Sequence, residues 1–498
     1  MSADPALSTG LGRRAIIIGG VAAGAAFVAA TADAPPANAS PAGAPLWYNA
    51  ETYSSTVKVT RSGSASTNTA NFNSMVAEVS DAGGGTIYFP GGKDAGASGA
   101  ELYKFNGVLR MKPNVTICGD GPSSTQFIWL DDSVPKEGYV AYFKSVTAAA
   151  IRNIGFNAGA SQANTKAVSI KVDDSRGILI EGCRFTSMRR VIDIYNGSTN
   201  VGIKGNTFRD STVGIAVSVL PQGGPAPSDI EISGNTFDGI IKDTQERDLE
   251  PPTAIYSQGV RVSATNNRIS DSGDTGITFG KGADDSSATH NTIYTQLVSI
   301  YVGNGALRTR IIGNSLRSES DYGIHAYNRD GFPNAAYTII EGNSISNCGK
   351  AGVHIEGADG VSCVGNVILN PGRRELPAAN DRQRSGILVS NNASLNKGSY
   401  TGPASNFARN CNISSNTIID DNDSSPTMRY GIHVRNASIG GMILSANTVG
   451  AAKNEKIRYP DDLPPADRVP AGTQWWSGTK PVWSNGTKWV DAAGAVVS

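Results

Sequence analysis

Short runs of alternating apolar and polar residues fill the middle of the chain and recur with a nearly fixed period. Each run ends in a small residue, an asparagine, one further residue and an apolar residue, as in "IEISGNTF" and "IIEGNSI". The shortest spacing between these asparagines is 23 residues. A period of this length predicts a solenoid. The asparagines at this position are Asn206, Asn235, Asn267, Asn291, Asn314, Asn343, Asn366, Asn416 and Asn447.

The kind of solenoid follows from the alternation. A period of two predicts β-strands, and amphipathic helical patterns are scarce. The leucine framework of leucine-rich repeats is missing from the sequence. Repeating short strands and turns therefore predict a parallel β-helix. An amide at one recurring bend can bond to the turn and to the amides above and below it, so we expect an asparagine ladder, with Cys183 in the same position one repeat earlier.

The start of the repeat region carries two phrases in a characteristic order. "NFNSMVAEVSDAGGGTIYFPGG" is followed by "NGVLRMKPNVTICGDGPSSTQFIW". With the asparagine repeats, this pattern resembles the right-handed β-helices of the pectate-lyase-like superfamily, over roughly residues 57–449. The resemblance implies an all-β fold: a right-handed parallel β-helix solenoid with a short N-terminal capping helix. It also implies that sugar chains bind along the first sheet of the solenoid.

Residues 1–39 have the features of an export signal. Arg13 and Arg14 precede an apolar run over residues 15–32, and Ala37-Asn38-Ala39 fits a cleavage site. This predicts a twin-arginine signal and a secreted or periplasmic protein. The alternative is an uncleaved membrane anchor, but the run is at the lower edge of spanning length and no second span follows. We therefore expect no stable membrane insertion after signal cleavage.

Composition indicates which classes of partner and cofactor the sequence gives reason to expect. The chain has 43 basic and 43 acidic residues among 498, a balance that gives no reason to expect nucleic acid as a partner. Its five cysteines show no metal-ligand spacing, and we expect them to be mostly small buried side chains. No acidic trio suited to calcium is evident, so calcium stays open as a cofactor and no metal ligand is assigned.

The repeat region predicts one solenoid domain over residues 40–450. Residues 451–472 are proline-rich and charged, which predicts a linker. Residues 473–498 contain "WSGTK" and "WSNGTK", with Asn485-Gly486 as a hairpin signal. We therefore expect a small C-terminal β-hairpin module. Its clustered tryptophans suit a cap on the last coil, with sugar binding or a homotrimer contact as alternatives.

Three of the four histidines lie in near-copies of one phrase: "YGIHAY", "AGVHIE" and "YGIHVR". The superfamily resemblance makes each phrase a strand of the first sheet. Alternation then turns the flanking apolar residues inward and the histidine outward. We therefore expect His325, His354 and His433 in one outward column. The rings of His325 and His354 should stack about 5 Å apart and face solvent and substrate.

The outward columns of this sheet carry residues that suit a saccharide. Tyrosine and histidine offer an apolar plane to a sugar ring and a polar edge to its hydroxyls. Long insertions predict loops that wall a cleft between Tyr256 and Leu388. The predicted substrate-binding residues are Tyr256, Tyr301, Asp274, Asp321, Arg384, His433 and Arg435.

The chemistry that these residues favour is β-elimination in a polysaccharide substrate. A lyase needs a base, a cation that neutralises a uronate carboxylate, and an acid for the leaving oxygen. Two adjacent coils offer these types together. The predicted catalytic residues are His325, Tyr327, Lys350, His354 and Glu356, and we expect an exported polysaccharide lyase.

Two alternatives stay open. A glycoside hydrolase needs two carboxyl groups about 5–9.5 Å apart. Asp193 and Glu356 are excluded at about 29 Å, whereas Asp274 and Asp321 are close to the limit at about 10 Å. The sequence lacks the NTD, GDD and GHG phrases of polygalacturonases, although acids in a loop could contribute: Asp243, Glu246, Asp248 and Glu250. The other alternative is a non-catalytic glycan-binding or adhesion solenoid, since fold does not fix function.

Overall fold

A computed structural model describes most of the chain after residue 45. The chain divides into two compact units, Met1–Pro45 and Leu46–Ser498, and the described residues all belong to the second unit. They are residues 46–92, 102–129, 139–157, 168–188, 190–218, 224–240, 252–327, 335–377, 383–390, 408–422, 424–435, 442–458, 471–472, 474–477 and 480–497. The predicted export signal lies outside them. Among these residues, no helix is long and apolar enough to span a bilayer.

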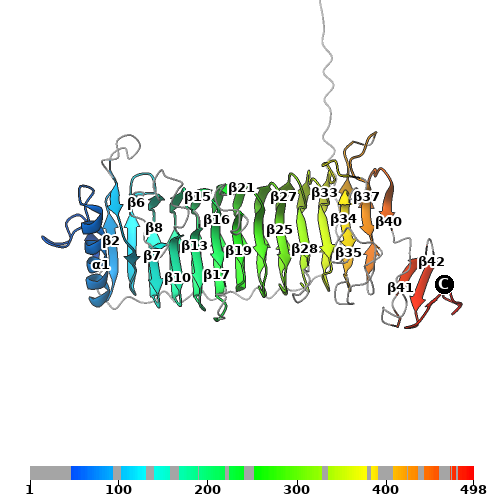
Figure 1. Cartoon of the computed structure of the whole chain (residues 1–498), viewed down its shortest axis with the longest axis horizontal. Coiled ribbons are helices and arrows are strands. Elements are labelled where there is room, and N and C mark those ends of the chain that lie inside the picture. The colour runs from blue at the N-terminus through cyan, green and yellow to red at the C-terminus, as the bar shows by residue number, and fades with distance from the viewer. Residues whose placement is uncertain are drawn as a thin grey trace, which may run out of the picture. The chain divides into compact units, whose positions relative to one another are not determined.

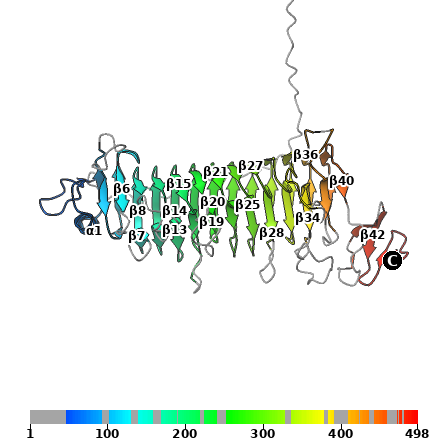
Figure 2. The ribbon, with the colours of Figure 1, turned by 45° about the horizontal axis from the view of Figure 1, so that its top comes forward.

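Three long parallel sheets make up the solenoid, as Figures 1 and 2 show. The chain visits them in turn, so each coil adds one strand to each sheet. This is the predicted parallel β-helix. The first sheet consists of β4 Leu109–Arg110, β7 Tyr139–Lys144, β10 Val168–Asp173, β13 Arg190–Tyr195, β16 Val213–Val217, β19 Thr253–Ser257, β22 Thr275–Phe279, β25 Val298–Gly303, β28 Ile324–Tyr327, β31 Val353–Glu356, β34 Ser385–Ser390, β37 Tyr430–Val434 and β40 Glu455–Arg458.

The second and third sheets follow the same order of coils. The second consists of β1 Trp47–Asn49, β2 Gly85–Phe89, β5 Val115–Gly119, β8 Thr147–Arg152, β11 Arg176–Glu181, β14 Thr199–Lys204, β17 Ser228–Ser233, β20 Val260–Thr265, β23 Ser287–Thr289, β26 Arg310–Ile312, β29 Ile339–Glu341, β32 Ser362–Val364, β35 Asn412–Ser414 and β38 Ile443–Ser445. The third consists of β3 Tyr103–Phe105, β6 Gln126–Trp129, β9 Gly155–Asn157, β12 Arg184–Thr186, β15 Thr207–Ser211, β18 Thr236–Ile240, β21 Arg268–Ser272, β24 Thr292–Thr295, β27 Ser315–Ser318, β30 Ser344–Ser346, β33 Val367–Leu369, β36 Thr417–Ile419 and β39 Thr448–Val449.

A single helix, α1 (Ala65–Asp81), precedes the first complete coil of the described chain. The Ser64 hydroxyl caps it by accepting a hydrogen bond from the backbone N–H of Thr67. The apolar face of α1 is buried and joins the solenoid core, where Phe72 meets Phe89 and Phe105. The predicted capping helix is therefore confirmed, and it covers the core beside the first strands of the solenoid.

The asparagine ladder is confirmed at the bend between the second and third sheets. The side-chain amide of Asn314 donates to Asn343 Oδ1 at 2.9 Å, and the backbone N–H of Asn314 donates to the same oxygen. The same pattern runs without a break from Asn206 to Asn447. In the coil before, the backbone N–H of Cys183 donates to Asn206. Each amide therefore satisfies turn groups that are buried away from water.

The recurring glycine before each histidine strand has a steric cause. A Cβ on Gly352 would come within 2.5 Å of Ile368 Cγ2, on the third sheet, and 3.0 Å of the Gly386 carbonyl. Any side chain at this position would therefore push the first and third sheets apart. After the glycine, alternation resumes as expected: Ile324 and Ala326 of β28 are completely buried in the core.

The solenoid continues further than the sequence predicted. Strand β40 pairs with β37 in the first sheet, so part of the expected linker, residues 451–472, forms one more first-sheet strand. The charged phrase "EKIR" contains Ile457, which packs against the core. Beyond it lies a small antiparallel sheet of β41 Gln474–Ser477, β42 Lys480–Ser484 and β43 Trp489–Val490. The turn Asn485–Lys488, which begins with Asn485-Gly486, joins β42 to β43 as the predicted hairpin requires.

The cysteines behave as small apolar side chains. All five are free thiols, four are buried, and Cys118 is half-buried. Burial raises the pKa of the Cys183, Cys348, Cys363 and Cys411 thiols to about 12. These four thiols are therefore structural rather than reactive.

Candidate functional site

The three histidine phrases form strands of the first sheet, as predicted. Parallel pairing places His325 of β28 beside His354 of β31. His354 in turn lies beside Leu388 of β34, and Leu388 beside His433 of β37. Neighbouring strands in a sheet are about 4.8 Å apart, so this register brings residues from four separate phrases into one row.

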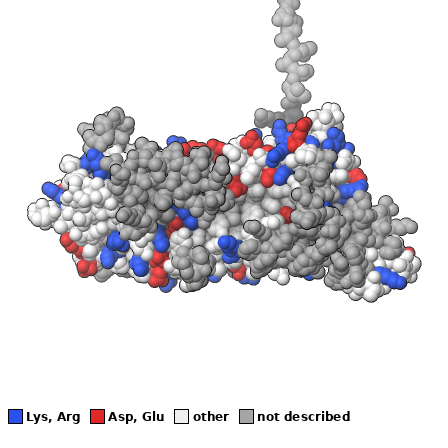
Figure 3. Space-filling model, viewed as in Figure 1, with Lys and Arg blue, Asp and Glu red and all other residues white. Residues whose placement is uncertain are grey.

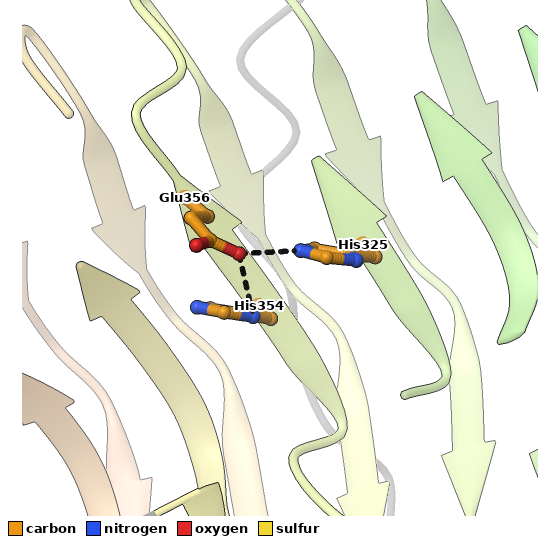
Figure 4. Close-up of side chains that lie close together, drawn as sticks. All are labelled: His325, His354 and Glu356. Atoms are coloured by element: carbon orange, nitrogen blue, oxygen red, sulfur yellow. Dashed lines mark hydrogen bonds and ion pairs between the residues drawn. The ribbon is translucent and has the colours of Figure 1, made fainter. Parts of the chain in front are cut away.

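His325 and Glu356 form the centre of the candidate site. The Nε2 of His325 lies 3.0 Å from Glu356 Oε2, within hydrogen-bonding distance. The rings of His325 and His354 are stacked with centroids 4.7 Å apart and planes 5° apart, which confirms the predicted stacking. Figure 4 shows the parallel rings on neighbouring strands, with the carboxylate of Glu356 reaching toward both.

The prediction that both rings face solvent is wrong for His354. His354 has no exposed surface, whereas the side chain of His325 is 13% exposed. The Nε2 of His354 lies 2.9 Å from the hydroxyl of buried Ser390. Its Nδ1 lies 3.6 Å from Glu356 Oε2 and has no hydrogen-bond partner among the described residues. His433 is also more covered than predicted, with 9% exposure.

A small apolar cluster on the outer side of the first sheet explains this burial. It consists of Val298, Tyr322, Ala351 and Leu388 and is separate from the solenoid core. The ring of Tyr322 lies 4.8 Å from both the His325 and the His354 rings. An outward-facing position on a strand is therefore not an exposed one here, because neighbouring residues form a second packed layer.

Burial sets the protonation of two residues in this layer. It lowers the pKa of His354 well below its ordinary value, helped by electrostatic repulsion from His325, Arg435 and Lys350. Burial also raises the pKa of Tyr322 well above its ordinary value, helped by the negative charges of Glu356 and Asp321. His354 and Tyr322 are therefore both neutral over the physiological pH range.

A groove with a volume of about 420 Å³ opens beside His325. It crosses the first sheet from β16 to β28. Its volume suits a small-molecule or sugar ligand. The ring of Tyr301 stands edge-on to His325, with centroids 5.8 Å apart. The ring centroid of Tyr327 lies 5.1 Å from that of His325 and 6.1 Å from that of Tyr301. The polar and aromatic residues that line the groove include Tyr256, Asp274, Thr278, Lys281, Tyr301, Asn304 and His325.

The structure thus brings part of the predicted site together. The groove takes up Tyr256, Tyr301 and Asp274 from the predicted substrate-binding set, but it begins near Val213 and ends at His325. Leu388, at the other end of the predicted cleft, belongs to the apolar cluster instead. Most of the predicted insertions, with Asp243, Glu246, Asp248 and Glu250, lie outside the described residues.

Other predicted residues have structural partners. Lys350 lies 2.8 Å from Asp321, which also lies 3.7 Å from Arg374. The Lys350 ammonium stands 5.2 Å from the Tyr322 ring centroid, so it supports the apolar cluster.

Three further predicted residues lie at the C-terminal coils or their turns. Arg384 donates from Nε to the Gly372 carbonyl at 2.7 Å. The ring of His433 lies 4.4 Å from that of Tyr430. Arg435 is close enough to influence the pKa values of His354 and Tyr322.

Sequence reasoning missed four residues of the site. Tyr322 opens the phrase "YGIHAY" itself, and its place beside the histidine was a signal that could have been used. Ser390 stands two residues after Leu388, in the column of Glu356. Lys281 and Asn304 lie in turns that follow first-sheet strands, where the sequence alone does not show which side chains border a groove.

The same cluster contains potential metal ligands. One donor atom from each of His325, His354 and Glu356 lies within 4.8 Å of the other two, the only such group of His, Cys, Asp or Glu within the described ranges. Two imidazoles and a carboxylate suit zinc better than calcium. However, the rings are stacked and parallel, so their in-plane lone pairs lie in separate planes and one ion cannot lie in both. We therefore assign these residues to proton chemistry and name no metal ligand.

Charge is mixed over the face shown in Figure 3. Lysine and arginine alternate with aspartate and glutamate over the described surface there. Among the described residues, many charged side chains pair between neighbouring coils, as Arg261 does with Asp229 at 2.6 Å. The described lining of the groove likewise includes one lysine and one aspartate, so a field of one sign does not distinguish it.

Fold and site together define a parallel β-helix with a polar and aromatic groove on its first sheet. The family described as "Right handed beta helix region" matches residues 142–296, 225–373 and 298–459. Since these matches jointly span more than half of the chain, the protein belongs to this family. Among curated proteins, no sequence is significantly similar to the chain.

Solved structures with this fold serve several functions. The A-module of the Azotobacter vinelandii mannuronan C-5 epimerase AlgE4 has a TM-score of 0.53 and 17% identity, over 82% of this chain and 97% of that one. PfbA, a surface adhesin of Streptococcus pneumoniae, has a TM-score of 0.53 and 12% identity, over 91% and 99%. The Dettilon tailspike protein has a TM-score of 0.51 and 14% identity, over 83% and 68%. At these identities the likeness is one of fold.

Proposed function

We propose that the protein is an exported polysaccharide lyase that cleaves uronic-acid chains by β-elimination. The observation that carries this proposal is the His325–Glu356 pair, 3.0 Å apart, at the wall of a groove lined by tyrosines. An imidazole held by a carboxylate is a common general base. Tyrosines beside it suit both a sugar ring and a departing sugar oxygen.

The first step is removal of the C5 proton of a uronate residue by Nδ1 of His325, because Nε2 is the nitrogen that faces Glu356. Ionised Glu356 accepts the hydrogen bond from His325 and stabilises the imidazolium that forms. His354 stacks on His325 from β31, the strand that also carries Glu356, and its depressed pKa keeps it uncharged. The neutral ring therefore orders His325 without adding a second positive charge beside it.

The second step is departure of the sugar linked through O4. The electron pair left at C5 forms the C4–C5 double bond as the C4–O4 bond breaks. A tyrosine hydroxyl gives its proton to O4. The candidates are Tyr301, which lines the groove, and Tyr327, whose ring centroid lies 5.1 Å from that of His325. The products are an unsaturated uronate at one new chain end and a hydroxyl at the other.

The described carboxylates give less support to a hydrolase. Glu356 and Asp274 lie on strands or turns three coils apart, about 14 Å at the spacing of strands in a sheet. That separation exceeds the limit of about 9.5 Å for two carboxyl groups that act together on one glycosidic bond. Asp321, the other candidate, is held by Lys350 and Arg374.

Fold relatives are consistent with a sugar substrate. The name of the Azotobacter vinelandii protein places its chemistry at carbon 5 of mannuronan, the carbon from which we propose that His325 removes a proton. PfbA is by its title an adhesin, so a relative with this fold can act without catalysis. The site, rather than the fold, therefore carries the proposal.

A polysaccharide panel tests the proposal. Purified protein is incubated with polyuronates and with neutral polysaccharides, and three quantities are followed: ultraviolet absorbance of the C4–C5 double bond, new reducing ends, and inversion at C5 by NMR. A lyase gives absorbance and reducing ends together on a polyuronate. Reducing ends without absorbance indicate a hydrolase, inversion without cleavage an epimerase, and binding alone an adhesin-like protein.

His433→Ala is a matched control for His325→Ala, since His433 occupies the same row but is not among the described residues that line the groove. We expect His325→Ala to lose about 100-fold or more of the activity. His433→Ala should keep most of it.

A further inference from the structure

We propose that Lys281 and Asn304 form a subsite that binds the carboxylate of a uronate residue in the groove. This inference rests on the proposed function for its substrate class. Both residues line the same groove as His325. They follow neighbouring strands, β22 and β25, in equivalent turns.

The two turns present these side chains in the same way. In the first, the Ala283 N–H donates to the Gly280 carbonyl across Lys281-Gly282. In the next coil, the Ala306 N–H donates to the Gly303 carbonyl across Asn304-Gly305. Lys281 has a φ of 45° and Asn304 a φ of 53°, and the glycine after each also has positive φ. These are features of a type I′ turn, in which asparagine followed by glycine is strongly favoured.

Lysine is therefore the unexpected residue of the two. Its backbone adopts the left-handed conformation at a place where the next coil uses the preferred asparagine. Its side chain is exposed, and no ion pair is recorded for it among the described residues. Lys350, in contrast, is held by Asp321. Lys281 thus presents an available ammonium to the groove.

Asn304 adds an unsatisfied polar group. Its Oδ1 is buried and has no hydrogen-bond partner among the described residues. Buried polar atoms are normally paired, so this one suggests a missing partner. With the amide as placed, the oxygen accepts a sugar hydroxyl; with the amide turned, its NH₂ donates to a carboxylate.

The distribution of charge in the groove favours an anionic ligand at this edge. Among the described lining residues, Lys281 is the only lysine or arginine and Asp274 the only acid. They stand at opposite ends of β22, since Asp274 precedes the strand and Lys281 follows it. A uronate is therefore attracted toward Lys281 and repelled from Asp274, which orients its carboxylate.

Equilibrium binding tests the subsite without relying on turnover. The His325→Ala protein is titrated by calorimetry with polygalacturonate, polymannuronate and polyguluronate, each beside its carboxyl-reduced, neutral form. The Lys281→Met substitution is then combined with His325→Ala in a double variant. We expect the preferred polyuronate to bind about tenfold more weakly after this change, as for loss of one charge-assisted hydrogen bond. The neutral polymers should bind as before, and Lys281→Arg should restore most of the affinity.

Lys144→Met is the matched control, because Lys144 is an exposed lysine at the end of β7 in the same sheet but outside the described groove lining. Lys144→Met should leave the affinity for the charged and the neutral polymers unchanged. Equal binding of polyuronate by the Lys281→Met and parent proteins would overturn the subsite, and so would a parent that binds charged and neutral forms alike. A protein that binds polyuronate through Lys281 but never forms the double bond would overturn the lyase proposal and leave the subsite standing.

Discussion

His354 is a buried histidine whose surroundings disfavour its charged form. It has no exposed surface, and electrostatic repulsion from His325, Arg435 and Lys350 opposes its protonation. Glu356, at 3.6 Å, is the carboxylate in contact with it, and Tyr322 contributes a neutral ring at 4.8 Å. Stability should therefore depend on pH through this residue.

The direction of that dependence follows from proton uptake. In the unfolded chain a histidine binds a proton near pH 6.5, whereas folded His354 stays neutral to a lower pH. Above pH 6.5 neither state gains the proton. As the pH falls below 6.5, the unfolded state binds the extra proton, and stability is lost by up to about 1.4 kcal/mol per pH unit.

Denaturant unfolding of wild type and His354→Asn at pH 7.5, 6 and 5 checks this prediction. Wild type should lose more stability than the variant between pH 7.5 and pH 5, because the variant lacks the titrating ring. Ionisable groups that do not contact residue 354 are shared and cancel in the difference. Identical pH dependence of the two proteins would show that His354 is already accessible to protons in the fold.

At the scale of residues, the sequence predicts the place of a residue on its strand better than its burial and its contacts. The spacing of "YGIHAY" and "AGVHIE" correctly places two histidines in one stacked row. It could not show that His354 is fully buried, because the covering residues Tyr322 and Leu388 come from different coils. Nor could it show that Lys350 is engaged by Asp321. Such contacts depend on how side chains pack across coils, which the alternation pattern does not encode.

At the scale of elements, the asparagine ladder holds the bend of each coil. Asn314 donates its amide to the Ala288 carbonyl and to Asn343, and it accepts from the Asn291 backbone and side chain. It is 1% exposed. Removing it leaves several buried groups without partners.

We expect Asn314→Ala to lower the free energy of unfolding by about 1–3 kcal/mol, the cost of leaving buried polar groups unpaired. Chemical denaturation measures the change. Asn454→Ala is the control, because Asn454 is exposed and outside the ladder, and it should stay within about 0.5 kcal/mol of wild type. Equal stability of both variants would mean that water replaces the lost amide at low cost.

The elements were the most predictable level of this protein. Strand alternation, a nearly fixed period and the asparagine at one bend each recur many times. A weak pattern in one coil can therefore be interpreted from the coils on either side. The exceptions had weak signals. The prolines and charges of residues 451–472 predict a linker and give no sign of strand β40, in which Ile457 fills an inward position beside Ile432.

At the scale of the whole molecule, export is a prediction from residues 1–39. If the arginine pair directs the protein to the twin-arginine pathway, replacing Arg13 and Arg14 by lysine should prevent export. Fractionation of cells that possess this pathway checks the result, with the wild-type gene in cells lacking it as the control. Export of the double variant at the wild-type level would argue for a different route.

The central claim is that His325 and Glu356 remove a proton beside a uronate carboxylate. The most direct measurement is the rate of double-bond absorbance on the best polyuronate of the panel, for wild type, His325→Ala and Glu356→Gln. We predict steady absorbance for wild type and a loss of about 100-fold or more for each variant, with each variant assayed at a temperature at which circular dichroism shows it folded. Wild-type absorbance that persists in both variants, or reducing ends that appear without any absorbance, would contradict the account.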